Sequence, residues 1–134
     1  MSSPPWTGVV TMTERRYLYL ANLAGDNLLT YRPVAYRLNE PYDGDEEKAV
    51  YVAVNQDGLA CYAGQTRPAR SWTGAAGIRL RQHAQEASKR DGWAMFWVLP
   101  LKWSTKPTII DWYERTIAAR LMVPLRHRRT SIEA

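Results

Sequence analysis

The chain has 134 residues, of which 46% are apolar and 23% are charged, close to the composition of an ordinary soluble domain. Its single cysteine, Cys61, excludes an internal disulfide framework and a four-cysteine zinc site. The N-terminus lacks the basic and apolar stretches of a signal peptide, and no segment approaches the roughly 18 apolar residues that cross a bilayer. We therefore expect a compact, soluble, cytoplasmic protein with no membrane partner.

The positive charge is unevenly distributed along the chain. The net charge is +5, yet residues 1–50 carry −2 and residues 51–134 carry +7. Fourteen of the eighteen basic residues are arginine, whose planar guanidinium suits bidentate phosphate contact. This distribution predicts a polyanionic partner, most commonly nucleic acid, although a solvated basic surface explains charge alone equally well.

Residues 1–48 are interpreted as an N-terminal extension. Thr13 followed by helix-forming residues and closed by Gly25 predicts a short capped helix, although its Tyr-Leu-Tyr-Leu run fits a strand equally well. Residues 31–38 are compatible with an edge strand. Residues 39–48 are acidic and turn-rich, typical of a connector. We expect the chemistry in residues 49–134.

The second part begins with a predicted β-hairpin. Residues 50–54 and 59–63 are β-prone runs joined through an Asp-Gly pair. A two-residue hairpin loop places Tyr51 and Tyr62 on the same face of the sheet, because side chains alternate along a strand. The same alternation places Cys61 on the opposite face, as an inert core thiol. The alternative interpretation of the tyrosines is cross-strand aromatic packing.

The rest of the second part predicts a helix, a strand and a helix. After a loop over residues 65–76, residues 78–90 are rich in helix formers, and residues 93–101 are apolar enough for a central buried strand. Pro107 fits the first turn of a helix that ends before Pro124. The predicted fold class is α/β, a small three-stranded antiparallel sheet flanked by helices.

Charged side chains occupy defined positions on the two helices. Arg79 and His83 are four residues apart and share one stripe of the first helix. Glu114 lies between Ile110 and Ile117 at the edge of an apolar stripe, where a carboxylate needs a cation or hydrogen bonds. The alternatives are that Arg79 and His83 are solvated surface groups and that Glu114 forms a structural ion pair with an arginine.

In these residues the sequence resembles the GIY-YIG nuclease family. Val50-Tyr51-Val52 resembles its first motif, with Val50 where a glycine is expected, and Tyr62-Ala63-Gly64-Gln65-Thr66 resembles the second. The Arg-x-x-x-His of Arg79 and His83 and the Glu114 of the last helix match in order. The resemblance covers about residues 49–127.

The resemblance implies a metal-dependent DNA endonuclease that either nicks or cuts both strands. Glu114 is then the ligand of a single Mg²⁺ or Mn²⁺ ion. Arg79 grips the scissile phosphate, Tyr51 orients or deprotonates the attacking water, Tyr62 holds phosphate or water, and His83 carries a proton or contacts phosphate. The tyrosines, the guanidinium and the carboxylate are therefore expected to converge around one cation.

DNA contacts are expected around this catalytic face. The family's asparagine after a proline is replaced here by Arg126 or His127, which motivates the alternative of a non-catalytic nucleic-acid-binding module. A protein-interaction domain with a basic surface is the third candidate. Double-strand cleavage calls for two subunits or two successive nicks, so a homodimer is compatible with the sequence. The expected DNA-binding residues are Gly64, Gln65, Arg67, Arg70, Trp72, Arg126, His127, Arg128 and Arg129.

Overall fold

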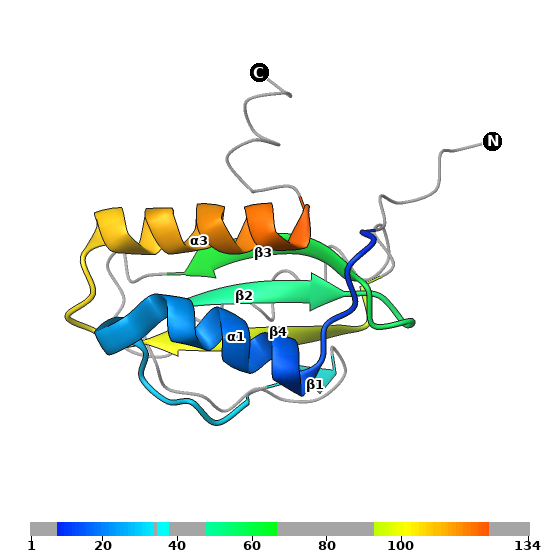
Figure 1. The fold of residues 1–134 in the computed structure, drawn as a ribbon, viewed down its shortest axis with the longest axis horizontal. Helices are drawn as coiled ribbons and strands as arrows, with labels where there is room; N and C mark the ends of the chain where they lie inside the picture. Colours follow the sequence, from blue (N-terminus) through cyan, green and yellow to red (C-terminus); the bar gives the residue numbers. More distant parts are fainter. Residues whose placement is uncertain (1–7, 34, 38–47, 67–92, 124–134) are drawn as a thin grey trace, which may run out of the picture.

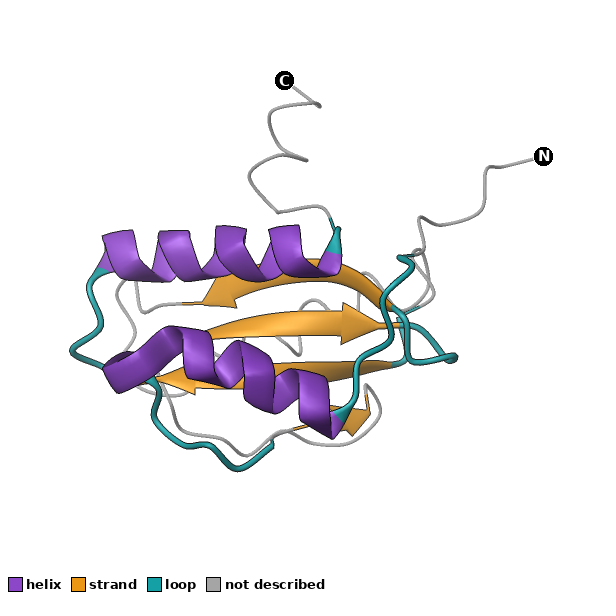
Figure 2. Ribbon diagram, in the orientation of Figure 1, coloured by secondary structure: helices purple, strands orange, loops and turns teal. Residues whose placement is uncertain are grey.

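A computed structural model describes residues 8–33, 35–37, 48–66 and 93–123. These residues form a mixed fold in which two α-helices pack against an antiparallel sheet (Figures 1 and 2). The expectation of an antiparallel sheet with helices is confirmed. No helix in the described ranges is long and apolar enough to span a membrane.

The first helix, α1 (Glu14–Ala24), starts and ends where the sequence predicts. The Thr13 side chain accepts a hydrogen bond from the Arg16 backbone N–H at 3.1 Å, and Gly25 follows the last turn at φ 59°. A threonine cap satisfies one of the free N–H groups of the first turn, and a glycine adopts positive φ without steric cost. The short 3-10 helix η1 (Gly25–Asn27) continues the chain. The helical interpretation is therefore confirmed over the alternative strand.

Among the described residues, the sheet contains one strand more than the three predicted for the second part. Its order is β1-β4-β2-β3, with β1 (Ala35–Arg37) antiparallel to β4 (Met95–Leu101), and β2 (Lys48–Val54) between β4 and β3 (Ala60–Thr66). Of the edge strand expected over residues 31–38, the structure describes Ala35–Arg37 as a strand, and the described residues 31–33 lie outside it. The hairpin and the buried strand after residue 93 are confirmed.

The hairpin loop is longer by one residue than expected, and a bulge follows it. Asn55 N–H donates to the Leu59 carbonyl at 3.1 Å, so the loop is Gln56-Asp57-Gly58, with Gly58 at φ 82°. Three-residue loops with a final glycine at positive φ are a common hairpin type. Val54 then pairs with Ala60, but Ala53 pairs with Tyr62, so Cys61 is the extra residue of a β-bulge.

The last helix, α3 (Pro107–Leu121), begins at the predicted proline and ends before Pro124. It packs with α1 on one face of the sheet. We call the apolar side chains of this layer the helix-facing cluster; it includes Tyr17 and Leu20 of α1, Val50 and Val52 of β2, Leu99 of β4, and Ile110, Tyr113 and Ile117 of α3. Residues from the N-terminal extension therefore share one core with the hairpin and α3.

The opposite face of the sheet carries a second buried cluster, which we call the aromatic cluster. It consists of Ala49, Tyr51, Ala53, Cys61, Tyr62, Trp93, Phe96 and Val98. Cys61 was expected on the face away from the tyrosines, and this is wrong. The bulge at Cys61 interrupts the alternation of side chains along β3, so the buried thiol packs in the same cluster as both tyrosines.

Candidate active site

The two hairpin tyrosines lie together, as predicted, within the aromatic cluster. Tyr51 is 0% exposed and Tyr62 is 2% exposed, and their ring centroids are 6.3 Å apart. Phe96 meets the Tyr51 ring edge-on at 5.6 Å, and Trp93 stacks on Tyr62 at 5.1 Å. Offset and edge-on arrangements are the favourable geometries for aromatic pairs. The cross-strand packing alternative for these tyrosines is thus physically present, and it fixes the position of both rings.

Gly64 provides the space in which the Tyr51 hydroxyl lies. Tyr51 and Gly64 are direct partners in the ladder between β2 and β3. A Cβ added to Gly64 would lie 2.5 Å from both Cζ and Oη of Tyr51, well inside van der Waals contact. The Tyr51 ring therefore passes over β3 at Gly64, because a residue with a Cβ would leave no room for it. Gly64 was expected to contact DNA, and its position gives it a structural role beside Tyr51.

Glu114 lies on the buried side of α3 with a polar partner from β3. The Glu114 side chain is 1% exposed, and its Oε1 accepts a hydrogen bond from Gln65 Nε2 at 3.2 Å. The same Nε2 donates to Asp111 Oδ1 at 2.8 Å. Asp111 precedes Glu114 by one helical turn, so both carboxylates reach the same amide. Gln65 thus supplies one of the hydrogen bonds that a buried carboxylate requires.

Gln65 was expected in the loop after the hairpin and at the DNA surface. The structure instead places it inside β3, opposite Val50 and 6% exposed. Its Nε2 is used by the two carboxylates, whereas its Oε1 accepts no hydrogen bond from the described residues. Two carboxylates and an amide oxygen are hard oxygen donors of the kind that Mg²⁺ prefers. The residues present therefore fit the divalent ion that the family resemblance implies.

The described residues could supply part of the coordination shell of this ion. They contain no group of three or more histidine, cysteine, aspartate or glutamate side chains placed to hold a metal. Magnesium sites commonly use one or two carboxylates and fill their other positions with water and phosphate oxygens. Glu114 and Asp111 match that pattern. Asp111 was not among the predicted site residues, although its position three residues before Glu114 was a readable signal.

The tyrosines and the carboxylate approach β3 from different faces of the sheet. Tyr51 and Tyr62 belong to the aromatic cluster, whereas Gln65 and Glu114 lie on the side of the helix-facing cluster. The Tyr51 hydroxyl lies over Gly64, and the carboxylate is held by the next residue, Gln65. The two groups thus flank neighbouring residues of one strand from opposite sides, and the expected convergence of the tyrosines and the carboxylate on one face of the sheet is wrong for the described residues.

The remaining predicted site residues lie outside the described part of the chain. This applies to the catalytic candidates Arg79 and His83 and to the helix over residues 78–90 that carries them. It applies also to the expected DNA contacts Arg67, Arg70, Trp72, Arg126, His127, Arg128 and Arg129. Their roles stay predictions.

Comparison of the chain with protein-family models, with curated proteins and with solved structures gave no significant match.

Proposed function

We propose that the chain is a metal-dependent endonuclease that hydrolyses DNA phosphodiester bonds. The observation that carries this proposal is the buried Glu114 carboxylate, held together with Asp111 by the glutamine that directly follows Tyr62-Ala63-Gly64. This contact joins two segments whose motifs resemble the GIY-YIG nucleases in sequence. It explains why a carboxylate occupies the apolar stripe of α3.

Phosphodiester hydrolysis needs an oriented water, stabilisation of charge on the pentacovalent phosphate, and help for the leaving oxygen. Glu114 and Asp111 would hold a Mg²⁺ or Mn²⁺ ion, which when bound supplies Lewis-acid stabilisation of that charge. The Tyr51 hydroxyl, fixed over Gly64, would orient the attacking water, and Tyr62 would hold the phosphate. Arg79 and His83 are proposed as the phosphate clamp and the proton carrier for the leaving oxygen.

Cleavage of a supercoiled plasmid, with Mg²⁺ or with EDTA, tests the proposal. We expect nicking by the unmodified chain with Mg²⁺ only, and a loss of at least about 100-fold in Glu114→Gln, which keeps the size of the side chain but weakens metal binding. Glu14→Gln, an exposed position on α1, is the matched control and should cleave normally. Nicking that persists in Glu114→Gln would refute the role of Glu114.

A second candidate function is a nucleic-acid-binding module without turnover. One observation favours it: the two tyrosines and the carboxylate lie toward different faces of β3. This alternative predicts salt-dependent DNA binding with no nicking in Mg²⁺ or Mn²⁺. The plasmid assay therefore separates the two functions, since only the endonuclease produces an EDTA-sensitive nicked form.

A further inference from the structure

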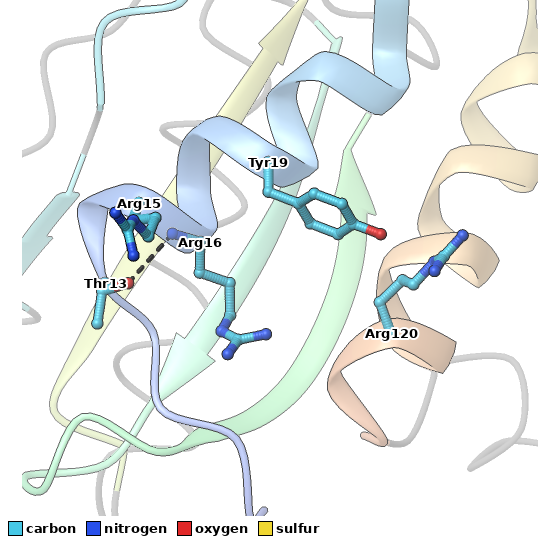
Figure 3. A pocket seen from close by; sticks show the side chains of 5 residues that line it. All are labelled: Thr13, Arg15, Arg16, Tyr19 and Arg120. Atoms are coloured by element: carbon cyan, nitrogen blue, oxygen red, sulfur yellow. Dashed lines mark hydrogen bonds between the residues drawn. The ribbon is translucent and has the colours of Figure 1, made fainter.

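A basic pocket lies between α1 and α3, away from the candidate active site. Its volume is about 500 Å³, and it is lined by Thr13, Arg15, Arg16, Tyr19 and Arg120. Figure 3 shows the Tyr19 ring extending from α1 toward Arg120 of α3, with Arg16 nearer the start of α1. None of these residues belongs to the motifs that suggest a nuclease.

Each side of the pocket is held in place by local contacts. Thr13 caps α1, and Arg16 Nε donates to the Thr11 carbonyl at 3.0 Å. This bond anchors the guanidinium of Arg16 and leaves its two terminal amino groups for a ligand. The Arg120 guanidinium lies over the Tyr19 ring, 5.9 Å from its centroid, within cation–π distance. The two guanidinium groups are therefore positioned without the help of carboxylates.

The charge around the pocket is positive and uncompensated. Within the described residues, no carboxylate forms an ion pair with Arg15, Arg16 or Arg120, and the nearby Glu14 does not line the pocket. Three guanidinium groups around one pocket repel one another, and the N-terminal end of α1 adds a partial positive charge. An anion is the ligand that relieves this repulsion.

The size of the pocket and its tyrosine indicate which anion. A volume of about 500 Å³ lies within the range of pockets that hold a small organic ligand, larger than a single phosphate needs. Tyr19 is 45% exposed, and an exposed aromatic ring beside arginines is the combination on which nucleic-acid bases stack. These features fit a nucleotide unit, with its phosphates on the arginines and its base at Tyr19.

We propose that this pocket binds the phosphodiester backbone of a single nucleic-acid strand, through Arg16 and Arg120, with a base against Tyr19. The choice of a strand as ligand rests on the proposed function. The pocket itself is separate from the site of that function, since Arg120 lies six residues beyond Glu114, about 9 Å along the helix axis. A strand bound here is held by α1 and α3 while another part of it reaches the sheet edge.

Fluorescence anisotropy with a labelled single strand of about 20 nucleotides tests this proposal. The measurements are made in EDTA, so that no cleavage occurs. We expect the double variant Arg16→Glu/Arg120→Glu to raise Kd at least about 10-fold and to reduce the slope of log Kd against log salt by about 1.4, as expected for two lost phosphate contacts on a single strand. Tyr19→Ala should raise Kd about 5-fold or more through lost stacking.

The control is Arg115→Glu, an exposed arginine on the same helix that does not line the pocket; it should change Kd less than about 2-fold. Equal losses in Arg115→Glu and in the pocket variants would overturn the proposal, because they would indicate only a general effect of charge. Inorganic phosphate that displaces the strand at the same concentration as a mononucleotide would also overturn it, in favour of free phosphate.

The experiment separates this proposal from the nuclease function. Strand binding that depends on Arg16 and Arg120, without any nicking in Mg²⁺, supports the pocket and refutes the endonuclease. EDTA-sensitive nicking with unchanged strand binding in the double variant refutes the pocket and supports the endonuclease.

Discussion

The contact between Tyr51 and Gly64 yields the sharpest test of the structure. In Gly64→Ala, the new Cβ would lie 2.5 Å from Tyr51 Cζ and Oη, so the ring must move by about 1 Å to reach ordinary contact. The ring is fully buried between Tyr62 and Phe96 and has no open side. Overpacking of this kind costs about 1–3 kcal/mol, which corresponds to a fall in Tm of roughly 4–12 °C for a domain of this size.

The cause of that loss can be isolated with a double-mutant cycle in urea denaturation. Tyr51→Leu removes both clashing atoms, and in this background Gly64→Ala should be neutral or stabilising by about 0.5 kcal/mol, since alanine loses less backbone entropy than glycine in a strand. Gly25→Ala is the control, because a Cβ there meets nothing within 4 Å, and its cost should be the same in both backgrounds. An equal cost of Gly64→Ala with Tyr51 and with Leu at position 51 would show that the reasoning about this contact is wrong.

Two further predictions concern α3. Tyr113 donates a 2.7 Å hydrogen bond to the Leu20 carbonyl, and burial raises the pKa of its hydroxyl above the ordinary value of 10.0. The protonated hydroxyl therefore contributes its full stabilisation of the folded state below pH 10. This contribution is lost as the pH rises further, because the unfolded chain then releases the proton more readily than the folded one. Tyr113→Phe should lower the free energy of unfolding by about 1 kcal/mol at neutral pH. Above pH 10, chemical denaturation should show this difference between the unmodified chain and the variant narrowing by up to about 1.4 kcal/mol per pH unit. A difference that stays constant at alkaline pH would contradict the argument from burial. Gln65→Leu removes the donor shared by both carboxylates of α3 and should lower the free energy of unfolding by about 1–3 kcal/mol, whereas Gln56→Leu in the exposed turn should change it by less than about 0.5 kcal/mol. Similar losses in both glutamine variants would contradict the role given to Gln65.

The elements that sequence predicted well are those with local signals. Thr13 and Gly25 bound α1, and Pro107 opens α3, because caps and first-turn prolines act within a few residues. Glu114 stood out because a carboxylate in an apolar stripe needs partners, and the structure supplies one. Gln65 could not be identified as that partner, since it is 49 residues away along the chain.

The face shared by the tyrosines was predicted correctly from a wrong hairpin geometry. The actual loop has three residues between Asn55 and Leu59, which by itself would place Tyr51 and Tyr62 on opposite faces. The bulge at Cys61 shifts the register by one residue and restores the shared face. This bulge contains no glycine that would mark it in the sequence, so neither it nor the position of the Cys61 side chain followed from the pattern of residues.

The hydrogen bonds between α1 and the rest of the fold limit how far the chain can be truncated at its N-terminus. The Tyr17 hydroxyl donates to the Val98 carbonyl at 2.9 Å, and Leu20 accepts from Tyr113 across the same layer. A fragment of residues 49–134 would lack α1, so the apolar side chains of β2, β4 and α3 that pack against this helix would be exposed to water. Such a fragment is expected to aggregate, and its inactivity would say nothing about catalysis; biochemical work therefore needs the chain from before Thr13 onward.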